Sequence, residues 1–166
     1  MKNHGGARQA VYAYAREDLD WWQAQLGREL TSGSFGENLT TAAVDVTGAR
    51  LGERWRIGPE VVLEVSGPRI PCATFAVWMG EPGWLKSFIA RARPGAYLRV
   101  WRAGEVHGGD EIEVVSRPDH DVSIGLCFRA LTREPELLPE LLAAGAFLED
   151  EIAERARNRR PFEIEE

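Results

Sequence analysis

Residues 60–72 are Glu60-Val61-Val62-Leu63-Glu64-Val65-Ser66-Gly67-Pro68-Arg69-Ile70-Pro71-Cys72. The apolar run at the start of this stretch predicts a buried β-strand, Glu60–Val65. Pro68 and Pro71 fix the backbone φ on either side of Arg69, so the chain enters Cys72 with little conformational freedom. A thiol close to a guanidinium suits a soft-metal ligand or a nucleophile, because the positive charge favours the thiolate. The alternative is that Cys72 is a small buried hydrophobic residue.

The composition is that of a globular protein with one core. The chain has 166 residues, 44% hydrophobic and 28% charged, which is enough for one domain with a small appendage. Its net charge of −6 excludes broad non-specific binding to nucleic acid, which needs a basic surface. Two cysteines, Cys72 and Cys127, are too few for a disulfide scaffold, and no apolar run approaches the ~20 residues that span a membrane. The first residues lack the apolar core of a signal peptide. We therefore expect a cytoplasmic protein, with neither nucleic acid nor a membrane as partner.

The pattern of residues predicts a β-rich body followed by helices. Strands are expected at Gln9–Ala15, Arg54–Ile57, Glu60–Val65, Ala96–Trp101, Glu111–Val115 and Val122–Phe128. Helices are expected at Asp18–Leu26, Gly83–Arg91, Glu134–Ala143 and Ala146–Arg159, with a break at Gly145. The predicted fold class is therefore mainly β with α, with a β domain over residues 1–131 and a C-terminal helical pair over residues 132–166.

Several segments, taken in order, resemble the MOSC domain, the module named after the C-terminal part of molybdenum cofactor sulfurases. The matching segments are His4–Gly6, Ala10–Tyr14, Gly33–Thr41 (GSFGENLTT), Pro68–Cys72 (PRIPC), Gly95–Val100 and Gly104–Asp110. The resemblance runs from His4 to about Arg129, and FGENLTT together with PRIPC is its most specific part. With its helical tail, the chain looks most similar to the bacterial YiiM-like branch of the family.

The resemblance implies a β-barrel of mixed parallel and antiparallel strands that holds molybdenum cofactor, which is molybdenum bound to molybdopterin. Cys72 matches the position of the cysteine that ligates the metal, and it is the expected catalytic residue. A thiolate agrees with this role, because it is a soft ligand that selects a sulfur-loving metal. Asn38, Thr40 and Arg69 are expected to hold the pterin phosphate.

Each of the other expected contacts has a structural alternative. Gly36-Glu37-Asn38 is either a turn whose N–H groups and Asn amide hold the cofactor, or a loop in which Asn38 caps Thr40 and Thr41. The Thr40 and Thr41 hydroxyls are either phosphate donors or simple turn residues. Arg69 pairs either with the cofactor phosphate or in a surface salt bridge. Arg99 is either a pocket cation stacked on aromatic residues or an exposed strand arginine.

The histidines and the second cysteine give weaker signals. His4 either donates into the site or is solvated, whereas His107 and His120 lie in expected turns and are not expected to be ligands. No spacing of His, Cys or carboxylate residues suggests a zinc site. Cys127 lies in an apolar run and is expected in the core.

The resemblance also implies a reaction. Known members of the wider family reduce N-hydroxylated compounds, including hydroxylaminopurines and amidoximes. No flavin or iron–sulfur motif is present in the sequence, so the electrons would come from a separate reductase such as a flavoprotein. A second hypothesis is a cofactor carrier or sulfur-transfer module in which Cys72 holds a persulfide. A third is a barrel that has lost its site.

The start of the sequence differs from that of most family members, which have further strands before the segment that matches His4–Gly6. Without those strands we expect unpaired sheet edges, which must be covered or paired with another chain. A homodimer is one way to pair them.

Overall fold

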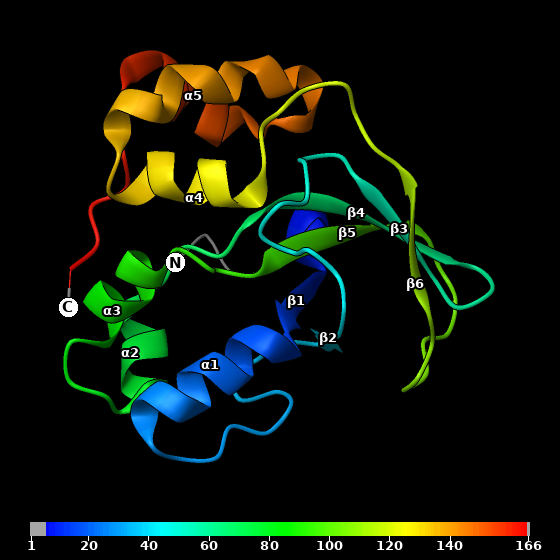
Figure 1. Ribbon diagram of the computed structural model, residues 1–166. Helices are drawn as coiled ribbons and strands as arrows, with labels where there is room; N and C mark the ends of the chain where they lie inside the picture. Colours follow the sequence, from blue (N-terminus) through cyan, green and yellow to red (C-terminus); the bar gives the residue numbers. More distant parts are fainter. Residues whose placement is uncertain (1–5, 166) are drawn as a thin grey trace.

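The computed structural model describes residues 6–165, and its centre is a six-stranded sheet in the order β2-β1-β5-β4-β3-β6. β1 and β2 are parallel, and the other neighbouring strands of the sheet are antiparallel. The sheet curls into a half-barrel that is open at β2 and β6 (Figure 1). The expected mixed sheet is therefore confirmed, in the form of an open half-barrel. The strands are β1 (Val11–Ala15), β2 (Leu39–Thr41), β3 (Arg54–Ile57), β4 (Val61–Pro68), β5 (Ala96–Arg102) and β6 (Ile112–Ser116).

Helices lie on both sides of this sheet. One group contains α1, α2 and α3, and the other contains α4, α5 and the 3-10 segment η2 (Figure 1). A short 3-10 turn, η1, precedes β1. The bounds are η1 (Ala7–Gln9), α1 (Arg16–Leu26), α2 (Ala73–Met79), α3 (Trp84–Arg91), α4 (Ile124–Thr132), η2 (Pro135–Phe147) and α5 (Asp150–Asn158).

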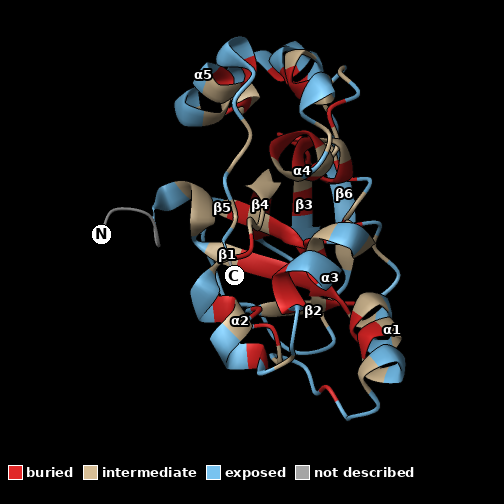
Figure 2. Cartoon of the chain, turned by 90° about the vertical axis from the view of Figure 1, so that its left-hand side faces the viewer, coloured by how far each residue is buried: buried red, intermediate tan, exposed pale blue. Residues whose placement is uncertain are grey.

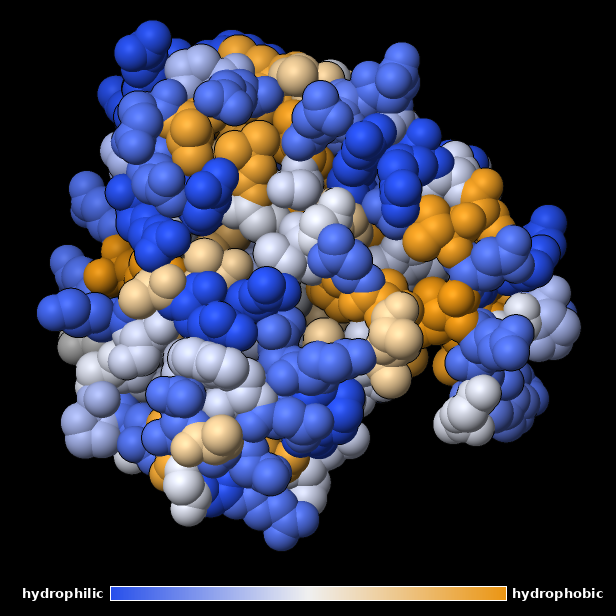
Figure 3. Space-filling view, viewed as in Figure 1, coloured by the Kyte–Doolittle hydropathy of each residue, from blue (hydrophilic) through white to orange (hydrophobic). Residues whose placement is uncertain are grey.

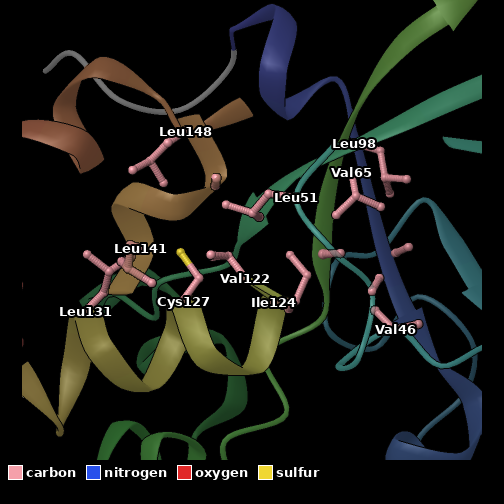
Figure 4. Close-up of a cluster of buried hydrophobic side chains, with 14 of the residues drawn as sticks. Val46, Leu51, Val65, Leu98, Val122, Ile124, Cys127, Leu131, Leu141 and Leu148 are labelled. Carbon is pink, nitrogen blue, oxygen red and sulfur yellow. The ribbon is translucent and has the colours of Figure 1, made fainter. Parts of the chain in front are cut away.

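The two helical groups enclose two hydrophobic cores of different composition. β1 separates them, because its side chains alternate: Ala13 and Ala15 face an aliphatic core, while Tyr12 and Tyr14 face an aromatic one. The aliphatic core lies between the sheet and the C-terminal helices, and Figure 4 shows the Cys127 sulfur within it. The aromatic core packs α1, α2 and α3 against β1. Both faces of β1 are therefore buried, as the red strand in Figure 2 shows.

One expected strand is wrong. Residues 122–128 were expected to form a strand, but α4 begins at Ile124, where the Ser123 hydroxyl caps it by accepting the Leu126 N–H at 3.1 Å. A run of seven mostly apolar residues is too short to separate the period of a strand from that of a helix, which explains the error. The remaining expected elements are confirmed with shifted ends, and the break at Gly145 is confirmed by its left-handed φ of 56°.

The proposed boundary at residue 131 stays a prediction. The aliphatic core contains side chains from the sheet and from α4, η2 and α5 alike, so the two segments share their packing. No helix in residues 6–165 is long and apolar enough to cross a membrane.

The open side of the half-barrel exposes apolar side chains. Trp101 on β5 and Val114 on the edge strand β6 are 52% and 39% exposed. The space-filling view shows hydrophobic surface gathered over this strand region (Figure 3). β2 and β6 are the edges of the described sheet, and the pairing of either edge with a second copy stays a prediction.

Candidate functional site

Cys72 lies between the end of β4 and the start of α2. Its backbone is extended, with φ −136° and ψ 169°, and its carbonyl oxygen accepts the Ala76 N–H at 3.1 Å. The thiol is free and half-buried. The sequence analysis did not predict α2, although Phe75 and Met79 show the i, i+4 spacing of a buried helical face. The stiff loop and this helix together fix the position of the thiol.

Cys72 lines a cavity of about 830 Å³. This volume lies within the range of small-molecule and cofactor sites. Residues 66–68 and 70–73 line it from the loop, and residues 162–165 line it from the C-terminal segment. Arg8, Gln9, Tyr97 and Cys127 also contribute, so the cavity is built from both ends of the described chain.

A second, smaller pocket of about 250 Å³ contains Arg69. It is lined by Gln9, Tyr12, Phe35, Gly36, Asn38, Arg69 and Tyr97. Gln9 and Tyr97 also line the Cys72 cavity, so the two hollows adjoin. The structure therefore places three of the expected cofactor residues around a pocket next to the cavity of the expected metal ligand.

Arg69 is held in the small pocket without a carboxylate partner. Its guanidinium donates to the Phe35 carbonyl oxygen and stacks on the Phe75 ring, 3.7 Å from the centroid. The Tyr12 ring lies 5.0 Å away. Within residues 6–165, no Asp or Glu forms an ion pair with Arg69, which removes the surface salt bridge as an alternative. Its positive charge is available to an anionic ligand.

Tyr97 connects the two hollows electrostatically. Burial raises the pKa of Tyr97, the Arg69 charge lowers it, and the electrostatic influence of Cys72 raises it. Burial likewise raises the pKa of Tyr12 well above its usual value, against the charge and hydrogen bond of Arg69, and the Tyr12 hydroxyl donates to Pro94 O at 2.6 Å. Both phenols therefore stay protonated at neutral pH. The sequence analysis had not placed either tyrosine in the site.

Of the expected residues in the GSFGENLTT loop, some stabilise the loop and others line the small pocket. Glu37 is 7% exposed, and its carboxylate accepts Gly33 N–H (2.6 Å), Phe35 N–H (3.0 Å) and the Thr40 hydroxyl (3.0 Å). Glu37 and Thr40 thus hold the loop together, and neither lines the two hollows. Their expected contact with a cofactor stays a prediction.

Gly36 and Asn38 line the small pocket itself. Gly36 has a φ of 77°, a backbone conformation that residues other than glycine rarely adopt. Asn38 binds β1 through both its side chain and its backbone, since Oδ1 accepts Tyr12 N–H at 2.8 Å and its own N–H donates to Tyr12 O at 2.9 Å. Asn38 therefore seats the loop on the sheet at the edge of the pocket.

Arg99 lies apart from this group and lines neither hollow. It binds the buried Glu64 at 2.6 Å, and Arg54 binds the same carboxylate at 2.9 Å. Both guanidiniums lie over the Trp101 ring, at 5.4 Å and 3.5 Å from its centroid. This network on the open face of the sheet satisfies the charge of Arg99.

The weaker candidates fall outside the site. His4 lies outside the described residues. His107 is exposed, and His120 bonds to two backbone groups, the carbonyl oxygen of Leu51 before β3 at 2.8 Å and the Val122 N–H of its own loop at 3.0 Å. No group of three or more metal-binding side chains occurs in residues 6–165. Cys127 is 1% exposed, as expected for a core residue.

The structure thus combines a curled mixed sheet with a free thiol that lines a cavity of cofactor size. The MOSC domain family matches residues 1–113, and the chain therefore belongs to that family. YflK of Bacillus subtilis (strain 168) is 34% identical over 124 residues, covering 75% of this chain and 56% of YflK. YiiM of Escherichia coli (strain K12) is 30% identical over 131 residues, covering 70% and 53%.

A protein of Gibberella moniliformis named a reductase is 34% identical over 118 residues, covering 69% of this chain and 21% of that protein. The chain thus spans about half the length of the two bacterial relatives and about a fifth of the fungal one. The crystal structure of YiiM from Geobacillus stearothermophilus has a TM-score of 0.83 at 27% identity, covering 94% of this chain and 80% of that one. The structure of YiiM from Escherichia coli, with a TM-score of 0.79 at 24% identity, covers 93% and 79% and shows the same fold.

The donor set fits the cofactor associated with this family. A half-buried thiol can present a soft sulfur to molybdenum, and the unpaired Arg69 can meet a phosphate in the adjoining pocket. Gly36 leaves its pocket open, because no atom lies within 4 Å of where its Cβ would be. The fit rests on Cys72, Arg69 and the Gly36–Asn38 turn, and does not need Arg99.

Proposed function

We propose that this chain binds molybdenum cofactor, with Cys72 as the metal ligand, and reduces N-hydroxylated compounds. One observation carries the proposal: the Cys72 cavity adjoins a pocket whose arginine has no carboxylate partner among the described residues. The Cys72 thiol and the Arg69 guanidinium lie in adjoining hollows that share Tyr97, and they would hold the metal and the phosphate. Membership of the MOSC family and a relative named a reductase support the reaction type.

The chain's own side chains would bind and orient. Arg69 would hold the phosphate, with Gly36 and Asn38 shaping the pocket around it. When bound, the cofactor supplies two-electron chemistry that converts an N–OH group and two protons into N–H and water. Tyr97 lines both hollows, and because its pKa is raised, its phenol keeps its proton at neutral pH and would be a hydrogen-bond donor to a ligand there. The electrons would come from a separate reductase, and a cytoplasmic location agrees with the two free cysteines.

The test is elemental analysis for molybdenum, with pterin fluorescence, on protein purified from a host that makes the cofactor. We expect near-stoichiometric molybdenum in the native chain and in Cys127→Ala, and none in Cys72→Ala. The loaded protein is then given a reductant and an amidoxime or hydroxylaminopurine. Molybdenum retained in full by Cys72→Ala would refute the metal ligand, and loaded protein without turnover would favour a cofactor carrier.

A further inference from the structure

The last described residues of the chain form part of the wall around Cys72. The segment Phe162–Glu165 has no regular secondary structure, and all four of its residues line the Cys72 cavity. It descends from the α4–α5 layer toward α2 and α3, passing between the two helical groups (Figures 1 and 2). A segment that both lines a cavity and joins two layers is placed to control entry to that cavity.

Specific contacts anchor this segment at its upper end. The Phe162 N–H donates to the Leu131 carbonyl oxygen at 2.8 Å. The Arg155 guanidinium lies 3.8 Å from the centroid of the Phe162 ring, and its Nη1 donates to the Pro161 carbonyl oxygen at 3.2 Å. These contacts join the segment to α4 and α5 at a defined position.

Beyond Phe162 the attachment is lighter. Ile164 is half-buried and packs against the aromatic core, in the cluster that Cys72 also touches. Glu163 and Glu165 are exposed. No backbone hydrogen bond of residues 163–165 to another part of the described chain is present. One anchored residue followed by one apolar contact is the arrangement of a strap that can be lifted at low cost.

The strap also gives the cavity a negative wall. Glu163 and Glu165, together with Glu149, line the cavity, and none of the three forms an ion pair within residues 6–165. Glu151 is compensated by Arg155 at 3.3 Å, and Arg8 is the basic residue of the lining. The charge of Glu149 reaches the interior, since it adds to burial in raising the pKa of Cys127 to about 12.

We propose that Phe162–Glu165 is a strap that closes the Cys72 cavity and disfavours anions, so that neutral and cationic small molecules reach the thiol more readily. The proposal concerns access to Cys72 and holds whether or not the thiol binds a metal. If the proposed function is also correct, the substrate is a neutral or cationic N-hydroxylated compound, and this extension rests on that function. Loading of a phosphate-bearing cofactor would then require the strap to lift.

The test measures how fast Cys72 of the full chain reacts with a cationic and an anionic methanethiosulfonate reagent of similar size. Mass spectrometry locates the label, and Cys72→Ser shows that Cys127 does not react. We expect the cation-to-anion rate ratio to exceed that of free cysteine by about 10-fold at low salt, because the wall is negative. In the double variant Glu163→Gln/Glu165→Gln the ratio should approach that of free cysteine.

The anchor is tested separately with Phe162→Ala, which removes the ring beneath Arg155. Both reagents should then react several-fold faster, because the strap is released. Since Glu163 and Glu165 are exposed, their substitution leaves folding intact and gives an answer even if Phe162→Ala unfolds. A native ratio equal to that of free cysteine overturns the charge selection. Unchanged rates in folded Phe162→Ala overturn the strap.

Discussion

The two hollows that meet at Gln9 and Tyr97 differ in how their charged side chains are satisfied. Around the small pocket, Glu37 is buried in the Gly33–Thr41 loop and accepts three hydrogen bonds, and Arg69 of the Pro68–Cys72 loop is stacked and hydrogen-bonded. In the Cys72 cavity, Glu163 and Glu165 are exposed and form no ion pair among the described residues. Glu37 therefore stabilises the loop in which it lies, whereas Glu163 and Glu165 only line the cavity. The difference comes from burial and from the hydrogen bonds that a buried carboxylate must form.

Of the changes predicted here, replacing Glu37 should have the largest effect on stability. Glu37→Ala leaves the N–H groups of Gly33 and Phe35 and the Thr40 hydroxyl without their acceptor, and Phe35 is buried. We expect the free energy of unfolding to fall by roughly 3–4 kcal/mol, measured by urea denaturation. The matched control is Glu163→Ala in the cavity wall, which should change it by less than about 0.5 kcal/mol. Equal effects of the two substitutions would contradict the distinction between Glu37, which stabilises its loop, and Glu163, which only lines the cavity.

Alkaline pH should produce the next largest effect, through the two buried tyrosines of β1, Tyr12 and Tyr14. Burial raises the pKa of Tyr12 and Tyr14 well above the ordinary value of 10.0, so the unfolded chain loses these protons first as the pH rises. The stabilisation is fully present below about pH 10 and is lost above it. Between about pH 10 and about pH 11 we expect a loss of about 1 kcal/mol for each of these two tyrosines, measured by urea denaturation.

The tyrosinate absorbance band provides the independent check on that pH effect. Folded protein should show little tyrosinate near pH 10, and the band should appear when the chain unfolds. All three tyrosines of the sequence have a raised pKa, so no ordinary tyrosine masks the result. A full tyrosinate band in folded protein at about pH 10 would contradict the burial of these side chains.

Much of the sheet was predictable from the sequence because its strands carry their own signals. Arg54–Ile57 alternates, Val61–Val65 is apolar, and a Gly-Pro turn separates the two, so β3 and β4 were predicted with close bounds. The strand expected at 122–128 is wrong because seven mostly apolar residues are too few to separate a strand from a helix, and the partly exposed helical face of Leu126, Arg129 and Thr132 extends beyond that window. Turn residues that bound an apolar run, as Gly58-Pro59 does before β4, therefore helped more than the apolar run itself.

The residues of the candidate site could be predicted only where they lie close together in the sequence. Cys72, Arg69 and Gly36–Asn38 lie in two short stretches with unusual proline and glycine content, and the structure brings them to adjoining hollows. Arg99 was grouped with them because its strand face suggested a pocket, yet its partner Glu64 comes from a neighbouring strand. The C-terminal wall depends on a contact between residues far apart in the chain, such as the bond from Phe162 to Leu131, for which no local pattern exists.

The smallest expected effect is the anion preference of the small pocket. Inorganic pyrophosphate should stabilise the native chain by about 1 kcal/mol when its concentration is several times its dissociation constant, seen as a rise in melting temperature. Arg69→Met should abolish the rise, because it removes the charge that has no carboxylate partner in the described chain. The matched control is Arg8→Met, which removes a guanidinium from the Cys72 cavity instead. Stabilisation that survives Arg69→Met but disappears in Arg8→Met would place the anion in the other hollow.

Arg69→Lys separates the charge of this residue from its shape. Lysine keeps the positive charge but loses the planar group that stacks on Phe75 and donates to the Phe35 carbonyl oxygen. We expect a melting-temperature rise with pyrophosphate between those of the native chain and Arg69→Met. Full retention would mean that charge alone attracts the anion and that the aromatic seat only stabilises the loop. Complete loss would mean that the anion is recognised by a guanidinium held rigid on the Phe75 ring. The fixed position of Arg69, more than its charge, would then distinguish the small pocket from the Cys72 cavity beside it.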